Sequence, residues 1–145
     1  MRCLRFTLAL AVLLVLSCST TTGPDGLKVG LRTARTTFAP ADTFKGTFTI
    51  SNTRANPVRT EFRALPRYEI DVYDKNDSVV LSSPWAYLQM TNELRLGPRG
   101  SEFYDVEFVL RTGNGLEPLP VGNYRIRARL LGYSEPHDDL NIRVE

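Results

Sequence analysis

The sequence has few of the residues that carry catalysis or bind metal ions. It contains two cysteines, Cys3 and Cys18, and a single histidine, His137. Both cysteines precede residue 19, so the rest of the chain has no thiol for a disulfide, a zinc site or a nucleophile. Zinc sites favour several histidine or cysteine ligands, which one histidine cannot supply. The composition therefore predicts a protein that is not an enzyme and that carries no metal or cofactor.

Catalytic motifs are missing as well. No G-x-S-x-G segment presents a serine nucleophile, and "TGNG" (Thr112–Gly115) lacks the lysine and helix of a phosphate-binding loop. The acidic cluster around His137, "EPHDD", has two interpretations. It is either a calcium-binding loop, although its spacing matches no EF-hand, or a polar connection between two strands. The second interpretation is favoured.

Long apolar runs are absent too, with one exception near the start. Leu8–Leu16 is almost wholly aliphatic, follows Arg2 and Arg5, and leads into Ser17 and Cys18. A basic head before an apolar run too short for a comfortable membrane span indicates a signal peptide over residues 1–17. One alternative is an ordinary secretory signal peptide, in which Cys18 would have no specific function.

The segment Val15–Cys18, "VLSC", resembles the lipobox of bacterial lipoproteins. The resemblance implies cleavage before Cys18 and diacylglycerol on its sulfur, which anchors the chain in a membrane. Residues 18–26 would then be the lipidated cysteine and a flexible tether of small and polar residues. Ser19 is similar to the residue at this position in proteins sorted to the outer membrane. We therefore expect a lipid-anchored protein of the cell envelope, in the outer membrane and facing the periplasm if the host has two membranes.

An excess of charge of one sign is also missing. The formal net charge of +2 equals the contribution of Arg2 and Arg5 in the leader, so the remaining chain is formally neutral. Proteins bind nucleic acids through concentrated positive charge. The sequence therefore gives no electrostatic reason to expect a nucleic-acid partner.

From Leu27 onward, apolar and polar residues alternate in the manner of half-buried strands. The clearest segments are "LKVGLRT", "TFKGTFTISN", "YEIDVYD", "EFYDVEFVL", "NYRIRARLL" and "LNIRVE", with shorter candidates at 58–62, 79–81 and 93–96. About seven to nine such strands, separated by turn residues, predict an all-β, immunoglobulin-like antiparallel β-sandwich over residues 27–145. Arginines and prolines are expected to protect its sheet edges. A single helical turn is expected within 86–93.

The alternation also assigns residues to the two faces of each strand. Five apolar positions are expected to point into the core: Ile70, Val72, Val106, Phe108 and Ile126. Arg125, Arg127 and Arg129 share an outward face. They either meet anionic lipid headgroups or an acidic partner, or pair with Glu and Asp across the sheet. The neutral net charge favours cross-strand pairing.

Two motifs carry a family resemblance. "YEIDVYD" (Tyr68–Asp74) and "PVGNY" (Pro120–Tyr124), in the order of segments between Thr43 and Gly132, resemble the intracellular proteinase inhibitor (BsuPI) domain family. The chain departs from that family at Leu81, where the family usually has tryptophan. The resemblance implies a β-sandwich and protease inhibition, although export would place the chain away from an intracellular protease.

The best candidate for partner binding is the loop "SSPWAYLQM". Trp85, Tyr87 and Met90 are of residue types enriched in interface hot spots, and Pro84 would stiffen the loop. The alternative is that Trp85 or Tyr87 caps one end of the core, which is slightly favoured. A second long loop, Thr112–Gly122, shows no specific chemistry.

These observations predict an envelope protein whose sandwich binds another protein without catalysis. One alternative is inhibition of a periplasmic or surface protease. The other is a structural or assembly-accessory role in the envelope.

Overall fold

The computed structural model describes residues 26–113, 115–133 and 136–145, which contain ten strands and no helix. The predicted signal peptide, Cys18 and the tether before Gly26 lie outside the described residues. The strands are β1 (Leu27–Thr33), β2 (Thr37–Phe38), β3 (Thr43–Asn52), β4 (Val58–Leu65), β5 (Tyr68–Tyr73), β6 (Val79–Ser83), β7 (Leu88–Leu96), β8 (Ser101–Val109), β9 (Gly122–Leu130) and β10 (His137–Val144). The predicted all-β sandwich is confirmed.

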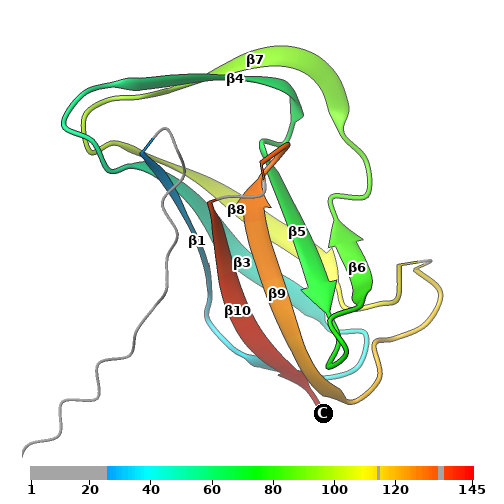
Figure 1. The fold of residues 1–145 in the computed structure, drawn as a ribbon. Coiled ribbons are helices and arrows are strands. Elements are labelled where there is room, and N and C mark those ends of the chain that lie inside the picture. Colours follow the sequence, from blue (N-terminus) through cyan, green and yellow to red (C-terminus); the bar gives the residue numbers. More distant parts are fainter. Residues whose placement is uncertain (1–25, 114, 134–135) are drawn as a thin grey trace, which may run out of the picture.

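Two sheets face each other, and a two-stranded ribbon arches over one end (Figure 1). One sheet has the order β1-β3-β8, the other has the order β2-β10-β9-β5-β6, and the ribbon is β4-β7. Pairing between these strands is antiparallel, except that the two residues of β2 run parallel to the end of β10. With this two-residue strand included, the described residues contain ten strands, compared with the expected seven to nine.

The helical turn expected within 86–93 is wrong, because Leu88–Leu96 forms β7. Pairing with β4 gives this segment backbone hydrogen bonds along its length, whereas an isolated helical turn is marginal in water. Leu94 and Leu96 also alternate into the core, which favours the extended conformation.

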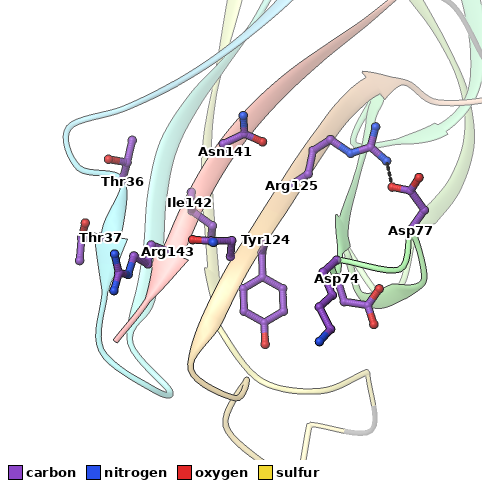
Figure 2. A pocket seen from close by; sticks show the side chains of 11 residues that line it. Thr36, Thr37, Asp74, Asp77, Tyr124, Arg125, Asn141, Ile142 and Arg143 are labelled. Carbon is purple, nitrogen blue, oxygen red and sulfur yellow. Dashed lines mark hydrogen bonds and ion pairs between the residues drawn. The ribbon is translucent and has the colours of Figure 1, made fainter.

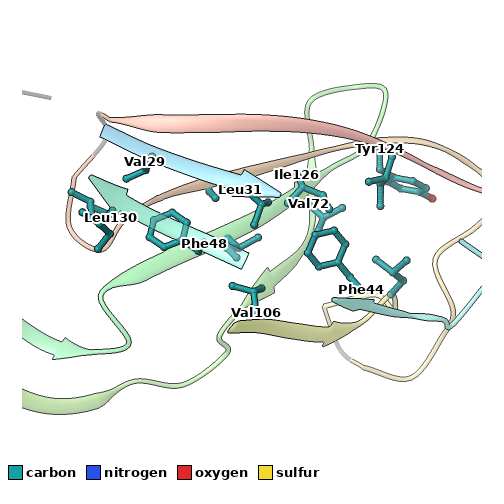
Figure 3. Packing of buried hydrophobic residues seen from close by; sticks show 14 of the residues in the cluster. Val29, Leu31, Phe44, Phe48, Val72, Val106, Tyr124, Ile126 and Leu130 are labelled. Atoms are coloured by element: carbon teal, nitrogen blue, oxygen red, sulfur yellow. The ribbon is translucent and has the colours of Figure 1, made fainter. Parts of the chain in front are cut away.

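The core lies between the two sheets (Figure 3). Phe44 and Phe48 come from β3 in one sheet, and Leu130 comes from β9 in the other. All three are almost fully buried in one apolar cluster. Tyr124 closes one end of this cluster, where its hydroxyl donates a 2.7 Å hydrogen bond to the Pro120 carbonyl. Such a tyrosine corner is a recurrent device of immunoglobulin-like sandwiches.

Most of the predicted inward positions are confirmed. The buried ones are Ile70, Val72, Val106 and Ile126. Phe108 is only partly buried, although its ring stacks on Phe44 with centroids 4.8 Å apart. The difference arises because β8 is an outer strand of its sheet, so the neighbour that would cover the other side of Phe108 is missing among the described strands.

Arg67 ties the ribbon to the three-stranded sheet. Its guanidinium, in a side chain that is 13% exposed, donates to Asn92 Oδ1 (2.6 Å) and to the Glu93 carbonyl (3.0 Å) on β7. It also donates to Glu102 Oε1 (2.6 Å) and Tyr104 Oη (2.9 Å) on β8. Burial and the hydrogen bond with Glu102 raise the pKa of Tyr104 to about 12.

Candidate functional site

The loop between β6 and β7 presents Trp85 to solvent. Trp85 is 94% exposed, and tryptophan is one of the residue types enriched in interface hot spots. The interpretation that Trp85 caps the core is therefore wrong. Pro84, which follows a cis peptide bond, and Tyr87 are both half-buried and hold the loop on either side of Trp85.

Tyr87 is held beside the outer face of β5. Burial raises the pKa of Tyr87 to about 12, and the nearby carboxylates of Glu69 and Asp71 add to the shift. Asp71 is itself buried and accepts hydrogen bonds from Ser82 (2.6 Å) and Arg129 (3.1 Å). Tyr87 thus fixes the loop next to a polar cluster rather than capping the apolar core.

A groove of about 630 Å³ opens beside Trp85. One wall is the end of β6 and the loop after it, and the other is the end of β8 with the segment that follows. Leu81, Phe108 and Val109 contribute apolar surface, and Glu107 and Arg111 contribute charge. The arrangement offers an apolar trough with a polar margin, which suits recognition of another chain more than chemistry.

The structure brings two of the four predicted partner-binding residues to this groove. Pro84 and Trp85 line it. Tyr87 instead lines a separate hollow, together with residues of β4, Gln89 of β7 and the segment after β9. Met90 lies on β7, where it is 43% exposed, and does not line the groove.

Five large exposed apolar residues lie outside the predicted loop: Val79, Phe103, Val109, Leu116 and Val121. Phe103 and Val109 occupy outward positions of β8, between the polar residues of that face. An apolar residue on an otherwise polar strand face is a signal that could have identified both. Leu116 and Val121 lie in the connection to β9, where the sequence has no periodicity to interpret.

The arginines of β9 are paired with acidic residues, which confirms the cross-strand interpretation. The ion pairs, at 2.8–3.3 Å, are Arg125 with Asp77 and Asp139, Arg127 with Asp139, and Arg129 with Glu69 and Asp71. Burial raises the pKa of Asp139, but the hydrogen bond and charge of Arg127 outweigh burial and hold that pKa below its usual value. The ladder therefore presents little unbalanced positive charge for lipid headgroups.

A polar hollow of about 680 Å³ lies on the outer face of the five-stranded sheet (Figure 2). Asn141 of β10 and Arg125 of β9 are cross-strand neighbours there. Arg125 donates to Asp77 on the β5–β6 turn at 2.8 Å, as the dashed line in Figure 2 shows. Arg143 pairs with Glu145 at 2.9 Å. These arginines are already engaged within the chain, and we assign no ligand to this hollow.

The cluster around His137 does not form a metal site in the described part of the chain, where no group of three or more His, Cys, Asp or Glu residues converges. His137 begins β10 opposite Arg129, while Glu135 lies outside the described residues. Among the residues that the structure covers, no helix has the length and apolar character to cross a membrane.

Comparison with known proteins gives similarity in structure only. No family model matches the chain, and no curated protein matches it in sequence. A β-glucosidase from Erythrobacter marinus matches over 82% of this chain with a TM-score of 0.52 and 12% identity. The sporulation control protein Spo0M from Bacillus subtilis matches over 83% with a TM-score of 0.51 and 17% identity. A β-glucosidase from Listeria innocua matches over 81% with a TM-score of 0.50 and 12% identity.

The likeness is one of fold alone. This chain spans 15% and 16% of the two β-glucosidases and 49% of Spo0M. At such low identity, a shared small β-sandwich carries no activity from one protein to another, because unrelated functions recur on this architecture.

Proposed function

We propose that this protein is a lipid-anchored envelope protein whose β-sandwich binds another protein without catalysing a reaction. Anchoring is supported by the lipobox-like Val15–Cys18 at the end of the apolar leader. Binding is supported by the Trp85 loop and the groove beside it.

The single observation that carries the binding proposal is the exposure of Trp85 at the margin of an apolar groove. Burying a tryptophan removes roughly 200 Å² from water, which at about 25 cal/mol per Å² favours binding by several kcal/mol. Pro84 and Tyr87 restrict the loop before binding, so less conformational entropy is lost when a partner covers Trp85. A free surface tryptophan with these supports is well suited to be a binding hot spot.

A second candidate function is inhibition of a periplasmic or surface protease. It is supported by the resemblance to the BsuPI family and by the shape of the loop, which projects Trp85 between two held positions. Pre-organised surfaces that change little on binding are typical of protease inhibitors. In this case the partner would be a protease and the same loop would contact it.

Chemical crosslinking in intact cells that express the full chain tests the proposal. Wild-type protein and Val121→Ala, which alters another exposed apolar residue, should capture the same partner, and Trp85→Ala should capture much less. If all three proteins captured the same amount of the partner, the Trp85 loop would not be the binding site. Incubating the purified protein with the captured partner or with a panel of serine proteases then separates inhibition from simple binding.

A further inference from the structure

β8 is the outer strand of the three-stranded sheet (Figure 1). Glu107, Phe108 and Val109 at the end of β8 line the Trp85 groove. Two hydrogen bonds beyond the ends of the β3–β8 ladder show how the backbone of β8 is oriented. Leu110 N donates to Asp42 O (2.8 Å), and Asn52 N donates to Gly100 O (2.9 Å). Both pairs continue the ladder register, in which hydrogen-bonded pairs alternate with non-bonded ones. The even-numbered residues of β8 therefore bond to β3, and the odd-numbered residues direct their N–H and C=O groups away from it.

The outward-directed backbone groups of β8 form a row along the strand. The odd-numbered positions are Ser101, Phe103, Asp105, Glu107 and Val109, and all five residues are exposed. Among the described residues, the one backbone hydrogen bond to this row comes from Arg111 N, which donates to Val109 O at 2.9 Å. The rest of the row is available to another strand.

The edges of β6 and β1 carry protection that β8 lacks. β6 is short, has an irregular register with β5, and is followed by Pro84. The edge of β1 is covered in part by Asp138, whose carboxylate accepts a 2.8 Å hydrogen bond from Leu31 N. β8 has nine residues, a regular register with β3, and no lysine, arginine or proline. A long, regular edge is a template for pairing with another chain, and the acidic residues Asp105 and Glu107 restrict which chain can pair with it.

The charges of β8 discriminate between possible occupants. In a symmetric antiparallel pair of two β8 strands centred on Asp105, this carboxylate would lie opposite its own copy and Phe103 would lie opposite Glu107. Like charges directly opposite each other destabilise a sheet. Glu107 forms an ion pair with Lys45 at 3.3 Å, in which both side chains are exposed. A strand with basic residues on its outer face therefore fits this edge better than a second copy of the chain.

The inner face of an added strand would meet different chemistry. Successive side chains of a strand point to opposite faces, so every second residue would point toward the groove. There the half-buried Phe108, together with Leu81 and Trp85, offers apolar surface. Apolar residues on the inner face and basic residues on the outer face together describe an alternating sequence.

We propose that the free edge of β8 binds an extended segment of another protein, with alternating basic and apolar side chains, as a fourth strand of the β1-β3-β8 sheet. Backbone hydrogen bonds to the odd-numbered residues supply affinity, and side chains in the groove supply specificity. The inference rests on the proposed binding function, because Trp85 would cover the apolar face of the added strand.

The test uses the full chain and a fluorescent dodecapeptide of alternating lysine and valine. The peptide should bind the wild-type protein, and the matched peptide of alternating glutamate and valine should not. Glu107→Pro removes an outward N–H but leaves the ladder to β3 intact, since proline is tolerated on the solvent side of an edge strand. It should weaken binding by at least about tenfold, whereas Glu107→Gln, which keeps the N–H, should weaken it less.

Residue-resolved amide exchange locates the bound peptide. The amides of Phe103 and Asp105 should exchange quickly in the free protein and be protected by the peptide. A lysine–valine peptide that is N-methylated at alternate residues should lose binding, and this control applies even if Glu107→Pro fails to fold. Failure of the lysine–valine peptide to bind, or protection that falls on other strands, overturns strand addition. Capture of the envelope partner that is lost in Trp85→Ala but kept in a folded Glu107→Pro would overturn strand addition and leave the proposed function standing.

Discussion

Asn52 and Gly97 are 45 positions apart in the chain, yet Asn52 Nδ2 donates a 2.9 Å hydrogen bond to the Gly97 carbonyl. The same amide donates to the Asn56 carbonyl at 2.8 Å, and its Oδ1 accepts from Arg54 N at 2.9 Å. Asn52 ends β3 where the chain turns toward the ribbon, and Gly97 follows β7 where the chain returns. One buried side chain thus joins the two turns from which the ribbon rises.

Replacing Asn52 by alanine should therefore destabilise the protein. The substitution removes three hydrogen bonds made by one buried side chain, which we expect to lower the free energy of unfolding by about 1–3 kcal/mol. Asn141→Ala, which removes an exposed amide on β10, should change it by less than about 0.5 kcal/mol. Urea denaturation of both variants provides the measurement, and similar midpoints for the two would show that the Asn52 contacts are not structural.

Two phenylalanines test the difference between the inner and outer strands of the small sheet. Phe48 is fully buried on β3, so Phe48→Ala should lower the free energy of unfolding by about 3–5 kcal/mol. Phe108 is partly exposed on β8, and Phe108→Ala should cost clearly less. Calorimetric melting of the two variants checks this order, and a larger loss for Phe108 would mean that β8 is covered in solution.

Two half-buried tyrosines, Tyr87 and Tyr104, predict a loss of stability at high pH. The pKa values of Tyr87 and Tyr104 are raised from 10.0 to about 12, with burial as the main cause. Between these values the unfolded chain releases protons that the folded chain keeps, so the stabilisation is complete below about pH 10 and declines as the pH rises toward 12. The melting temperature of Tyr87→Phe should fall less over this interval than that of the wild type. Parallel curves would show that Tyr87 ionises normally in the folded protein.

The anchor prediction concerns Cys18. Cys18→Ala should abolish acylation, because no sulfur remains to accept diacylglycerol, and the protein should leave the membrane fraction or keep its leader. Cys3→Ala, which changes the cysteine inside the predicted leader, should leave anchoring intact. Mass spectrometry of the protein from membranes detects the acyl chains, and an unacylated wild type would refute the anchor.

Trp85 and Tyr87 should differ in their effect on folding although they are neighbours in one loop. Trp85→Ala removes a side chain that is 94% exposed, so we expect the free energy of unfolding to change by less than about 0.5 kcal/mol. Tyr87→Ala exposes the neighbouring polar cluster and should cost about 1–3 kcal/mol. A large loss of stability in Trp85→Ala would show that Trp85 is packed in the core. The loop would then no longer be the preferred binding surface.

The sequence predicts which residues of a strand point into the core better than it predicts which strands pair with each other. Alternation is a local property, so it correctly placed Ile70, Val72 and Ile126 in the core. Whether a strand is central or outer depends on pairing between distant segments, and the partial exposure of Phe108 follows from such pairing. β2 has only two residues and therefore no period to detect.

The same limit applies to the candidate site. Pro84 and Trp85 were identified from residue type, but the groove beside them needs β6 and β8 to end on the same side of the sandwich, which no local pattern specifies. The exposure of Trp85 also depends on how the loop is held. Tyr87 is half-buried near the carboxylates of Glu69 and Asp71 on β5, a proximity between distant segments that periodicity does not predict.

β10 lies between β2 and β9 inside the five-stranded sheet, although it is the last of the ten strands in chain order. During synthesis from the N-terminus, β2 therefore waits for β10, and β5, which can pair early with β6, still waits for β9 on its other side. Long-range pairing of this kind slows folding. The five-stranded sheet therefore closes only after β10 has been made, whereas the β1-β3-β8 sheet and the β4-β7 ribbon do not depend on that strand.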